Sequence, residues 1–438
     1  MGTSEPQLTT DTGLSKIAWL SKQNREQTFC SLMHHVNVES LRSCFEKLDG
    51  KKASGVDGIT KAEYGSRLED NLQDLIQRMK RMAYRPKAVR EVLIPKEGQK
   101  GKTRPLGIST LEDKIVQKRI QEILDNIYEP IFVDWSYGFR PGRSAHDAIK
   151  SISAHLFRNE VETVLDVDLA NFFGTINHDK LKELLQLKIK DTKFLRYISR
   201  MFKAGVLSNG ELVVSDEGVP QGSCCSPILA NVYAHYVLDE WLEKTVKPLM
   251  AGNMSCFRFA DDLVVCFRYA NDAQRVRKVL AKRLEKYGLQ LNEDKTKMVK
   301  FSKRGRNGGI KQESFNFLGF TFYLGRPAKG VVLPKLKTEG KRFRAKLQRV
   351  KAWFRDIKNK EATLQVWKTF CAKLRGHIQY YGVSHNTKRV EEFIAQARKI
   401  AFKWLNRRSQ RKSFNWHQFE LFTKRFPLPR VKVMHRLF

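Results

Sequence analysis

Two adjacent aspartates, Asp261 and Asp262, interrupt an otherwise apolar stretch of the chain. Phe257 and Phe259 precede the pair, and apolar residues from 263 to 267 follow it. Two apolar runs with a short break predict a β-hairpin that carries the acids at its tip. Oxygen ligands without a Cys or His set nearby favour Mg²⁺ over Zn²⁺. Asp is also a common turn residue for local reasons, so this stretch alone leaves both interpretations open.

A second acidic stretch lies upstream. Asp166 and Asp168 alternate with Leu165, Val167 and Leu169, which puts both carboxylates on one face of a predicted strand. Like charges on one face repel unless a cation or solvent separates them. If this strand lies beside the hairpin, the gathered carboxylates can hold two divalent ions for phosphoryl transfer. The alternative is a solvated strand edge.

The net charge of +35 implies a polyanionic partner. No apolar run approaches the length of a membrane span, and residues 1–25 lack a signal-peptide core, so nucleic acid is favoured over a membrane. Residues 326–438 carry 30 Lys and Arg against 6 Asp and Glu, a net charge of +24. The 7 cysteines show no C-x-x-C spacing and predict reduced thiols in a cytoplasmic protein.

Cations and glycines occur at several predicted turns. Residues 92–108 predict a hairpin whose arms carry Lys96 and Arg104, which suit a nucleotide triphosphate, although a plain surface hairpin is the alternative. The stretch 136–143 interleaves aromatic residues with arginines, as in loops that contact nucleic acid. The loop 218–223 is rich in Gly and Pro, which allows close approach to a ligand, although most such loops have no function.

The length of 438 residues predicts two or three domains. Alternating apolar residues predict a strand over 315–322. Apolar residues at helical spacing predict helices over 14–48, 61–82, 110–128, 178–206, 227–245 and 271–287, and again beyond 335.

Together these stretches resemble the reverse transcriptase/maturase proteins encoded in bacterial group II introns, over about residues 14–438. The motifs are Gly-Val-Asp-Gly (55–58), Arg-Pro-Leu-Gly-Ile (104–108), Ser-Tyr-Gly-Phe-Arg-Pro (136–141), Asp-Val-Asp-Leu (166–169), Val-Pro-Gln-Gly (219–222), Phe-Ala-Asp-Asp (259–262) and Phe-Leu-Gly-Phe (317–320). Residues 374–381 and 404–411 look like the thumb/maturase region of the family. We expect the lineage that lacks a C-terminal endonuclease domain.

The resemblance implies an α+β right-hand polymerase. It divides the chain into an N-terminal extension with fingers (1–160), a catalytic palm (161–325) and a helical thumb/maturase region (326–438). Matched position by position, the metal-binding residues are Asp168, Asp261 and Asp262, with Asp166 as a nearby acid and Lys295 as the proton donor to pyrophosphate. The implied nucleotide-binding residues are Lys96, Arg104, Phe173 (which excludes a ribose 2′-OH) and Gln221. The expected RNA-binding residues are Arg140, Arg143, Arg407, Arg408 and Arg411.

Three positions depart from the family pattern. Phe259 replaces a Tyr, Gly174 stands where an Asp is usual, and Cys225 occupies a usually aliphatic place. None of them belongs to the implied metal triad, so we expect an active enzyme.

The expected function is RNA-directed DNA synthesis with two Mg²⁺ ions, which Mn²⁺ can replace, together with intron splicing and retrohoming. The expected partners are group II intron RNA, an RNA template with a DNA primer, dNTPs and target DNA, with no membrane and no obligatory protein partner. Two alternatives stay open: a host-adopted reverse transcriptase used in repair or phage defence, and a non-catalytic RNA-binding splicing factor on the same fold.

Overall fold

The computed structural model of the chain describes residues 12–95, 103–208, 210–220, 222–303, 313–325, 332–408 and 415–437. Three residues of the predicted site, Lys96, Gln221 and Arg411, lie outside these ranges.

Helices dominate the N-terminal part. The predicted helix over 14–48 is two helices, because the side chain of Asn37 caps a new one that starts at Val38. The predicted helix over 110–128 is confirmed as α5. The bounds are α1 (Thr12–Gln23), η1 (Met33–His35), α2 (Val38–Lys47), α3 (Lys61–Gly65), α4 (Leu68–Lys80) and α5 (Leu111–Tyr128).

A small sheet follows this helical part. Its strands are β1 (Val89–Pro95), β2 (Thr103–Ile108), β4 (Val206–Ser208) and β5 (Glu211–Val213), in the order β2-β1-β4-β5. β1 and β2 pair antiparallel, which confirms the predicted hairpin over 92–108.

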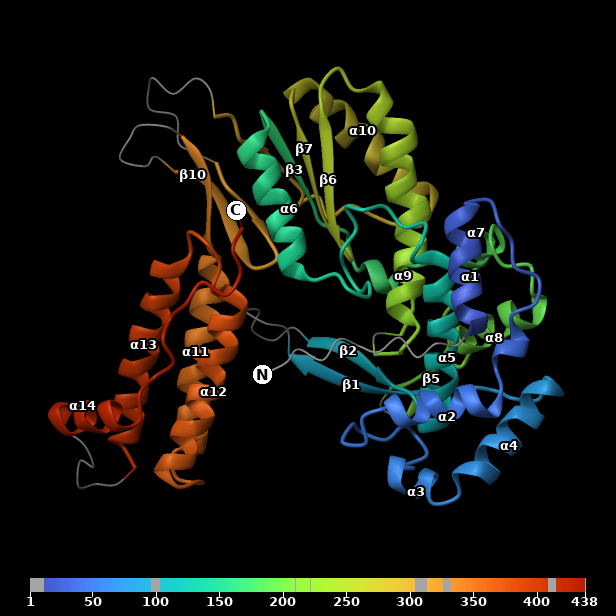
Figure 1. The fold of residues 1–438 in the computed structure, drawn as a ribbon, viewed down its shortest axis with the longest axis horizontal. Coiled ribbons are helices and arrows are strands. Elements are labelled where there is room, and N and C mark those ends of the chain that lie inside the picture. Colours follow the sequence, from blue (N-terminus) through green and yellow to red (C-terminus); the bar gives the residue numbers. More distant parts are fainter. Residues whose placement is uncertain are drawn as a thin grey trace.

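The central sheet has the order β6-β7-β3-β8 and is antiparallel throughout. Helix α6 lies along one face of the sheet and α10 beside the other (Figure 1). The strands are β3 (Thr163–Val167), β6 (Met254–Phe259), β7 (Asp262–Phe267) and β8 (Lys297–Lys300). The associated helices are α6 (Ala145–Arg158), η2 (Phe172–Gly174), α7 (His178–Gln186), α8 (Thr192–Lys203), α9 (Ser226–Ala234), η3 (His235–Asp239), η4 (Trp241–Val246), η5 (Lys247–Leu249) and α10 (Ala270–Lys286).

A third sheet joins the central sheet to the C-terminal helices. The prediction of one strand over 315–322 is wrong, because the backbone turns at Leu318 and Gly319, whose φ angles are 49° and 81°. The strands are β9 (Phe315–Phe317), β10 (Phe320–Gly325) and β11 (Leu333–Thr338). The helices that follow are α11 (Gly340–Ile357), α12 (Thr363–Tyr381), α13 (Thr387–Leu405) and α14 (Trp416–Arg425), which we call the C-terminal helical region.

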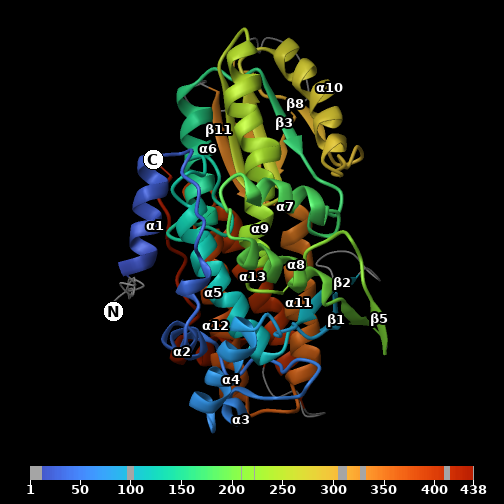
Figure 2. The same ribbon diagram turned by 90° about the vertical axis from the view of Figure 1, so that its right-hand side faces the viewer.

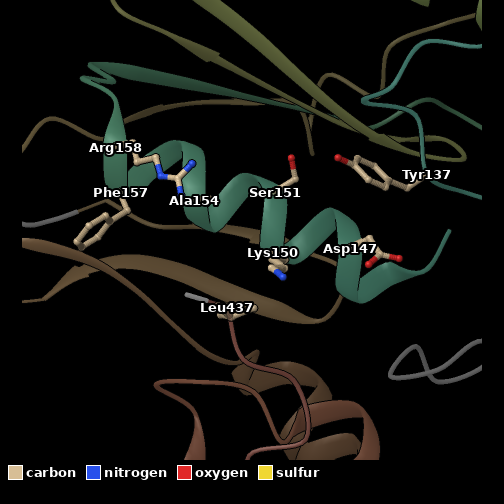
Figure 3. Close-up of a pocket in the computed structure, with 8 residues that line it drawn as sticks. All are labelled: Tyr137, Asp147, Lys150, Ser151, Ala154, Phe157, Arg158 and Leu437. Carbon is tan, nitrogen blue, oxygen red and sulfur yellow. The ribbon is translucent and has the colours of Figure 1, made fainter.

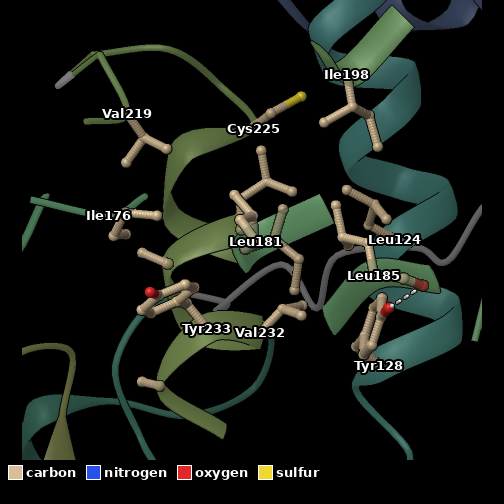
Figure 4. Close-up of a cluster of buried hydrophobic side chains, with 14 of the residues drawn as sticks. Leu124, Tyr128, Ile176, Leu181, Leu185, Ile198, Val219, Cys225, Val232 and Tyr233 are labelled. Carbon is tan, nitrogen blue, oxygen red and sulfur yellow. Dashed lines mark hydrogen bonds between the residues drawn. The ribbon is translucent and has the colours of Figure 1, made fainter. Parts of the chain in front are cut away.

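The apolar core is divided into three clusters. The first runs from Leu14 to Leu289, so the N-terminal helices share one core with a face of the central sheet; Figure 4 shows part of it. The second cluster joins α6, the other face of the central sheet and the third sheet. The C-terminal helical region has its own cluster, and it lies to one side of the molecule (Figure 1). In the turned view, α10 and helices α3 and α4 lie at opposite ends (Figure 2).

The predicted domain boundaries stay a prediction. The first cluster crosses the expected boundary at residue 160, and the expected boundary at 326 falls outside the described ranges. All 7 cysteines are free thiols. Among the described helices, none has the length and apolarity needed to cross a bilayer.

Candidate active site

The two adjacent aspartates lie at the tip of a hairpin, as predicted. Strands β6 and β7 pair antiparallel up to Phe259 and Asp262, so that Ala260 and Asp261 form the connection. Ala260 has a φ of 59°, an uncommon conformation for a residue with a side chain. The turn is therefore held in one shape by its surroundings rather than by local preference.

The first acidic stretch lies directly beside this hairpin. β3 pairs antiparallel with β7, with Asp166 opposite Val264 and Val167 opposite Leu263. Continuing this register by one residue brings Asp168 opposite Asp262. Alternation along both strands then puts Asp166, Asp168 and Asp262 on the same face of the sheet. The predicted neighbourhood of the two acidic stretches is confirmed.

Burial and the neighbouring negative charges raise the pKa values of these carboxylates. Burial, followed by the charges of Asp262 and Asp168, raises the pKa of Asp166 to about 7. Burial, followed by the charges of Asp261 and Asp168, raises the pKa of Asp262 to about 6. The pKa of Asp261 is raised mainly by burial, and the nearby cation of Arg104 acts in the opposite direction. Arg104 on β2 therefore lies within electrostatic reach of the aspartate turn.

Lys295 meets Asp168 at the end of β3. Its Nζ atom lies 3.1 Å from both carboxylate oxygens of Asp168. The backbone fixes this approach, because the N–H of Asn292 donates to the carbonyl of Asp168 at 2.8 Å and the Asp168 N–H donates to the hydroxyl of Thr296 at 3.3 Å. Lys295 thus lies in the predicted site, paired with one of its acids.

Three of the four acids, Asp166, Asp168 and Asp262, line a hollow of about 530 Å³. Lys341 and Arg342, from the start of α11, also line it. Within the described ranges, no three or more His, Cys, Asp or Glu side chains converge in an arrangement that could itself hold a metal ion. The hollow thus places carboxylates and cations from distant parts of the chain around one space.

A second pocket, on α6, is separate from this hollow. Figure 3 shows its lining residues, which include Tyr137, Lys150, Arg158 and Leu437 but none of the site aspartates.

Sequence reasoning missed the buried group that supports the aspartate turn. The side chain of Arg258 is 1% exposed and forms an ion pair with Asp239, which is 0% exposed. Its guanidinium also donates to the carbonyl of Ala260 at 3.0 Å and to the side chain of Asn231 at 3.2 Å. Arg258 stands in an apolar strand, and that interruption was the available signal, because a buried cation requires a partner.

The predicted sugar-excluding residue Phe173 lies in η2, just after β3. It is 8% exposed and packs against Phe172, with ring centroids 5.5 Å apart. Gly174 follows it, where a Cβ would collide with the side-chain amide of Asn171. The third departure, Cys225, is 2% exposed within the first core cluster (Figure 4).

The structure contradicts the predicted role of Arg140. Its side chain is 3% exposed, pairs with Glu129 at 2.8 Å and donates to the carbonyls of Val133 and Ser136. Arg140 is therefore a structural residue, which corrects the prediction that it binds RNA. Arg143 is partly exposed and donates to the backbone and carboxylate of Asp134, so its RNA contact stays a prediction.

The C-terminal arginines differ in exposure. Arg407 is exposed, and its guanidinium lies 5.6 Å from the ring centre of Trp404. Arg408 is half-buried and donates to the carbonyl of Glu361 at 2.7 Å. Of the two, Arg407 has the geometry of a surface cation.

Several known proteins are similar to this chain. Relatives include the group II intron-encoded protein LtrA of Lactococcus lactis subsp. cremoris, 35% identical over 223 residues, which is 51% of this chain and 37% of that protein. Protein YkfC of Escherichia coli (strain K12) is 36% identical over 44% of this chain and 51% of its own length. The putative COX1/OXI3 intron 1 protein of Saccharomyces cerevisiae is 25% identical over 86% of this chain and 52% of its own length.

The chain thus spans between about a third and a half of the length of these relatives, two of which are intron-encoded by name. This confirms the predicted resemblance to group II intron-encoded proteins, and the three sheets with their helices confirm the α+β class. A family model described as "Reverse transcriptase (RNA-dependent DNA polymerase)" matches residues 94–322, which is more than half of the chain and includes every aspartate of the site. The chain therefore belongs to the reverse transcriptase family.

Proposed function

We propose that this protein is an RNA-directed DNA polymerase that also binds group II intron RNA and assists its splicing and mobility. The observation that carries the proposal is the hollow lined by Asp166, Asp168 and Asp262 together with Lys341 and Arg342 of α11. A protein that only bound RNA would gain nothing from directing carboxylates toward a polyanion, since like charges repel.

Asp168, Asp261 and Asp262 would each supply carboxylate oxygens to two Mg²⁺ ions, which Mn²⁺ could replace. Because no three such groups converge among the described residues, phosphates of a bound nucleotide and waters would complete the coordination. The donor chemistry fits, because carboxylate oxygens are the ligands that Mg²⁺ prefers and the raised pKa values of Asp261 and Asp262 reflect burial and crowded negative charge. Ions bound there would stabilise negative charge on the attacking and leaving oxygens of phosphoryl transfer. Asp168 is paired with Lys295, so metal binding would compete with that ion pair.

Other residues of the chain would handle the nucleotide. Arg104, within electrostatic reach of Asp261, would contact the triphosphate of a dNTP, together with Lys96. Lys295, a partly exposed cation that lines the hollow, would protonate the leaving pyrophosphate. Phe173 would exclude a ribose 2′-OH by collision, and Gln221 would lie beside the template.

The C-terminal helical region would bind RNA. Residues 326–438, which include this region, carry a net charge of +24, which suits binding of a structured polyanion. Intron RNA, an RNA template with its DNA primer, and target DNA are the proposed partners, with Arg407 as an exposed contact.

The test is primer extension on an RNA template with Asp261→Ala and Asp262→Ala. We expect a loss of several orders of magnitude, on the scale of removing groups that act only in the transition state. RNA affinity should stay near that of the wild type, and chelation of divalent ions should abolish extension by the unaltered protein. Asp70→Ala, on the exposed face of α4, is the matched control and should extend normally. Normal extension by either site variant would refute the proposal.

A further inference from the structure

An exposed aromatic residue with a strained backbone lies beside the proposed nucleotide site. Phe139 is 51% exposed and has a φ of 58°, in the left-handed region that residues with a side chain rarely adopt. Neither exposure nor backbone strain stabilises a fold. Such a conformation persists only where the surrounding structure imposes it, which is frequent at functional sites.

The backbone on both sides of Phe139 is held firmly. The N–H of Tyr137 donates to the carbonyl of Arg258 at 2.8 Å, and the side-chain amide of Asn231 donates to the carbonyl of Gly138 at 2.7 Å. Gly138 packs so closely on the backbone of Ala260 that a Cβ at position 138 would collide with it. The loop that carries Phe139 is thus attached to the aspartate turn itself.

The Arg140 side chain anchors the other end of the loop. Its guanidinium donates to the carbonyl of Ser136 at 2.8 Å and pairs with Glu129 at 2.8 Å, almost fully buried. The half-exposed ring of Phe139 is therefore carried by a loop with little freedom to move. Rigid presentation of an apolar ring suits a surface that positions another group.

The ring of Phe139 packs against the proposed sugar-excluding residue. Its centroid lies 6.2 Å from that of Phe173 with the rings edge to face at 82°, and 6.4 Å from that of Phe259. Phe172 packs on Phe173 as well, with centroids 5.5 Å apart. Phe173 is 8% exposed, and Phe139 and Phe172 are two of the rings packed against it.

We propose that Phe139 is a positioning residue that holds the Phe173 ring in place, and that it thereby sets how strictly the enzyme distinguishes deoxyribonucleotides from ribonucleotides. This inference rests on the proposed function of Phe173. A gate that works by collision discriminates only if its ring cannot retreat from the added hydroxyl. Removing the ring of Phe139 leaves space into which Phe173 can move. Phe173 then excludes the ribose 2′-OH less strictly, and ribonucleotides are accepted more readily.

The experiment compares kcat/KM for a dNTP and the matching rNTP in the full-length protein. Phe139→Ala should lower the dNTP preference by about tenfold, the scale on which pocket contacts discriminate between similar substrates. Phe139→Tyr and Phe139→Leu keep most of the volume and should retain the preference within about threefold. Thermal unfolding of Phe139→Ala should match the wild type, since a half-exposed ring contributes little to the fold.

A double-variant cycle separates positioning from direct action. Phe173→Ala alone should lower the preference at least as much as Phe139→Ala, and the double variant should be no worse than Phe173→Ala, because Phe139 acts through Phe173. Additive losses, or an unchanged preference in Phe139→Ala, would overturn the inference. An equal loss of kcat/KM for the dNTP and the rNTP in Phe139→Ala would assign Phe139 a merely structural role, and it would also overturn the inference. Failure of the wild type to extend any primer would instead refute the proposed function.

Discussion

The aspartate site of the central sheet and the C-terminal helical region differ in how their charged side chains are held. At the aspartate site, buried partners such as Arg258 and Asn231 hold the turn that carries the acids, and each acid interacts with its neighbours. In the C-terminal helical region, which has its own apolar core, cations such as Arg344, Lys351 and Arg355 lie exposed on α11.

The difference suits the functions that we propose for the two regions. Phosphoryl transfer depends on carboxylates held within fractions of an ångström, which needs rigid support. Binding of a polyanion depends on the number of exposed cations and tolerates mobile side chains. The two regions meet where Lys341 and Arg342, at the start of α11, line the hollow with the aspartates.

We expect the largest loss of stability from a substitution that removes the buried support of the aspartate turn. Asp239→Ala should leave Arg258 as an unpaired buried cation and cost about 3–5 kcal/mol of unfolding free energy, measured by urea denaturation. The matched control is Arg42→Ala, which breaks an exposed pair with Glu69 and should cost less than about 1 kcal/mol. Similar losses in the two variants would show that the buried pair does not support the fold.

The stability of the C-terminal helical region should fall in acid because of a buried histidine in its core. His377 is 5% exposed, stacks on Phe393 at 3.7 Å, and neither ring nitrogen has a hydrogen-bond partner among the described residues. Burial lowers its pKa to about 3, whereas an unfolded chain binds the proton near 6.5. The neutral His377 side chain thus makes its full contribution to the unfolding free energy above pH 6.5. As the pH falls from 6.5 toward 3 this contribution is lost, and the loss reaches about 2 kcal/mol at pH 5.

His377→Phe should keep the stacked ring and remove this dependence. The unfolding free energy of the variant should therefore fall less between pH 7 and pH 5 than that of the wild type. His417→Phe, at an exposed position on α14, is the control and should follow the wild-type curve. Parallel curves for wild type and His377→Phe would contradict the prediction.

The smallest expected effect concerns RNA binding. Replacing Arg407, Arg408 and Arg411 together should make the log–log salt dependence of RNA affinity shallower by about 2, because fewer counterions are released. Replacing Lys278, Lys282 and Lys286, exposed on α10, changes the charge equally and should leave the slope nearly unchanged. Equal slopes in the two triple variants would indicate that the C-terminal charge only solubilises the protein.

Much of the local structure was predictable because it depends on neighbours in the chain. The hairpin at Asp261, the acidic strand face at Asp166 and Asp168, and helix α5 each follow from short-range patterns of apolar and polar residues. The turn at Leu318 and Gly319 was missed although the alternation changes phase there, from odd positions (Phe315 and Phe317) to even ones (Leu318, Phe320 and Phe322).

The sequence by itself determined the net charge, the acidic motifs and the family resemblance that follows from them. Tertiary structure alone decided that Arg140 is buried with Glu129, that Arg258 supports the aspartate turn, and that Phe139 packs on Phe173. The reason is physical: the burial and partners of a charged or aromatic side chain depend on segments far away in the chain. For Arg140, unlike Arg258 in its apolar strand, no local pattern distinguishes an arginine that faces RNA from one that holds the fold together.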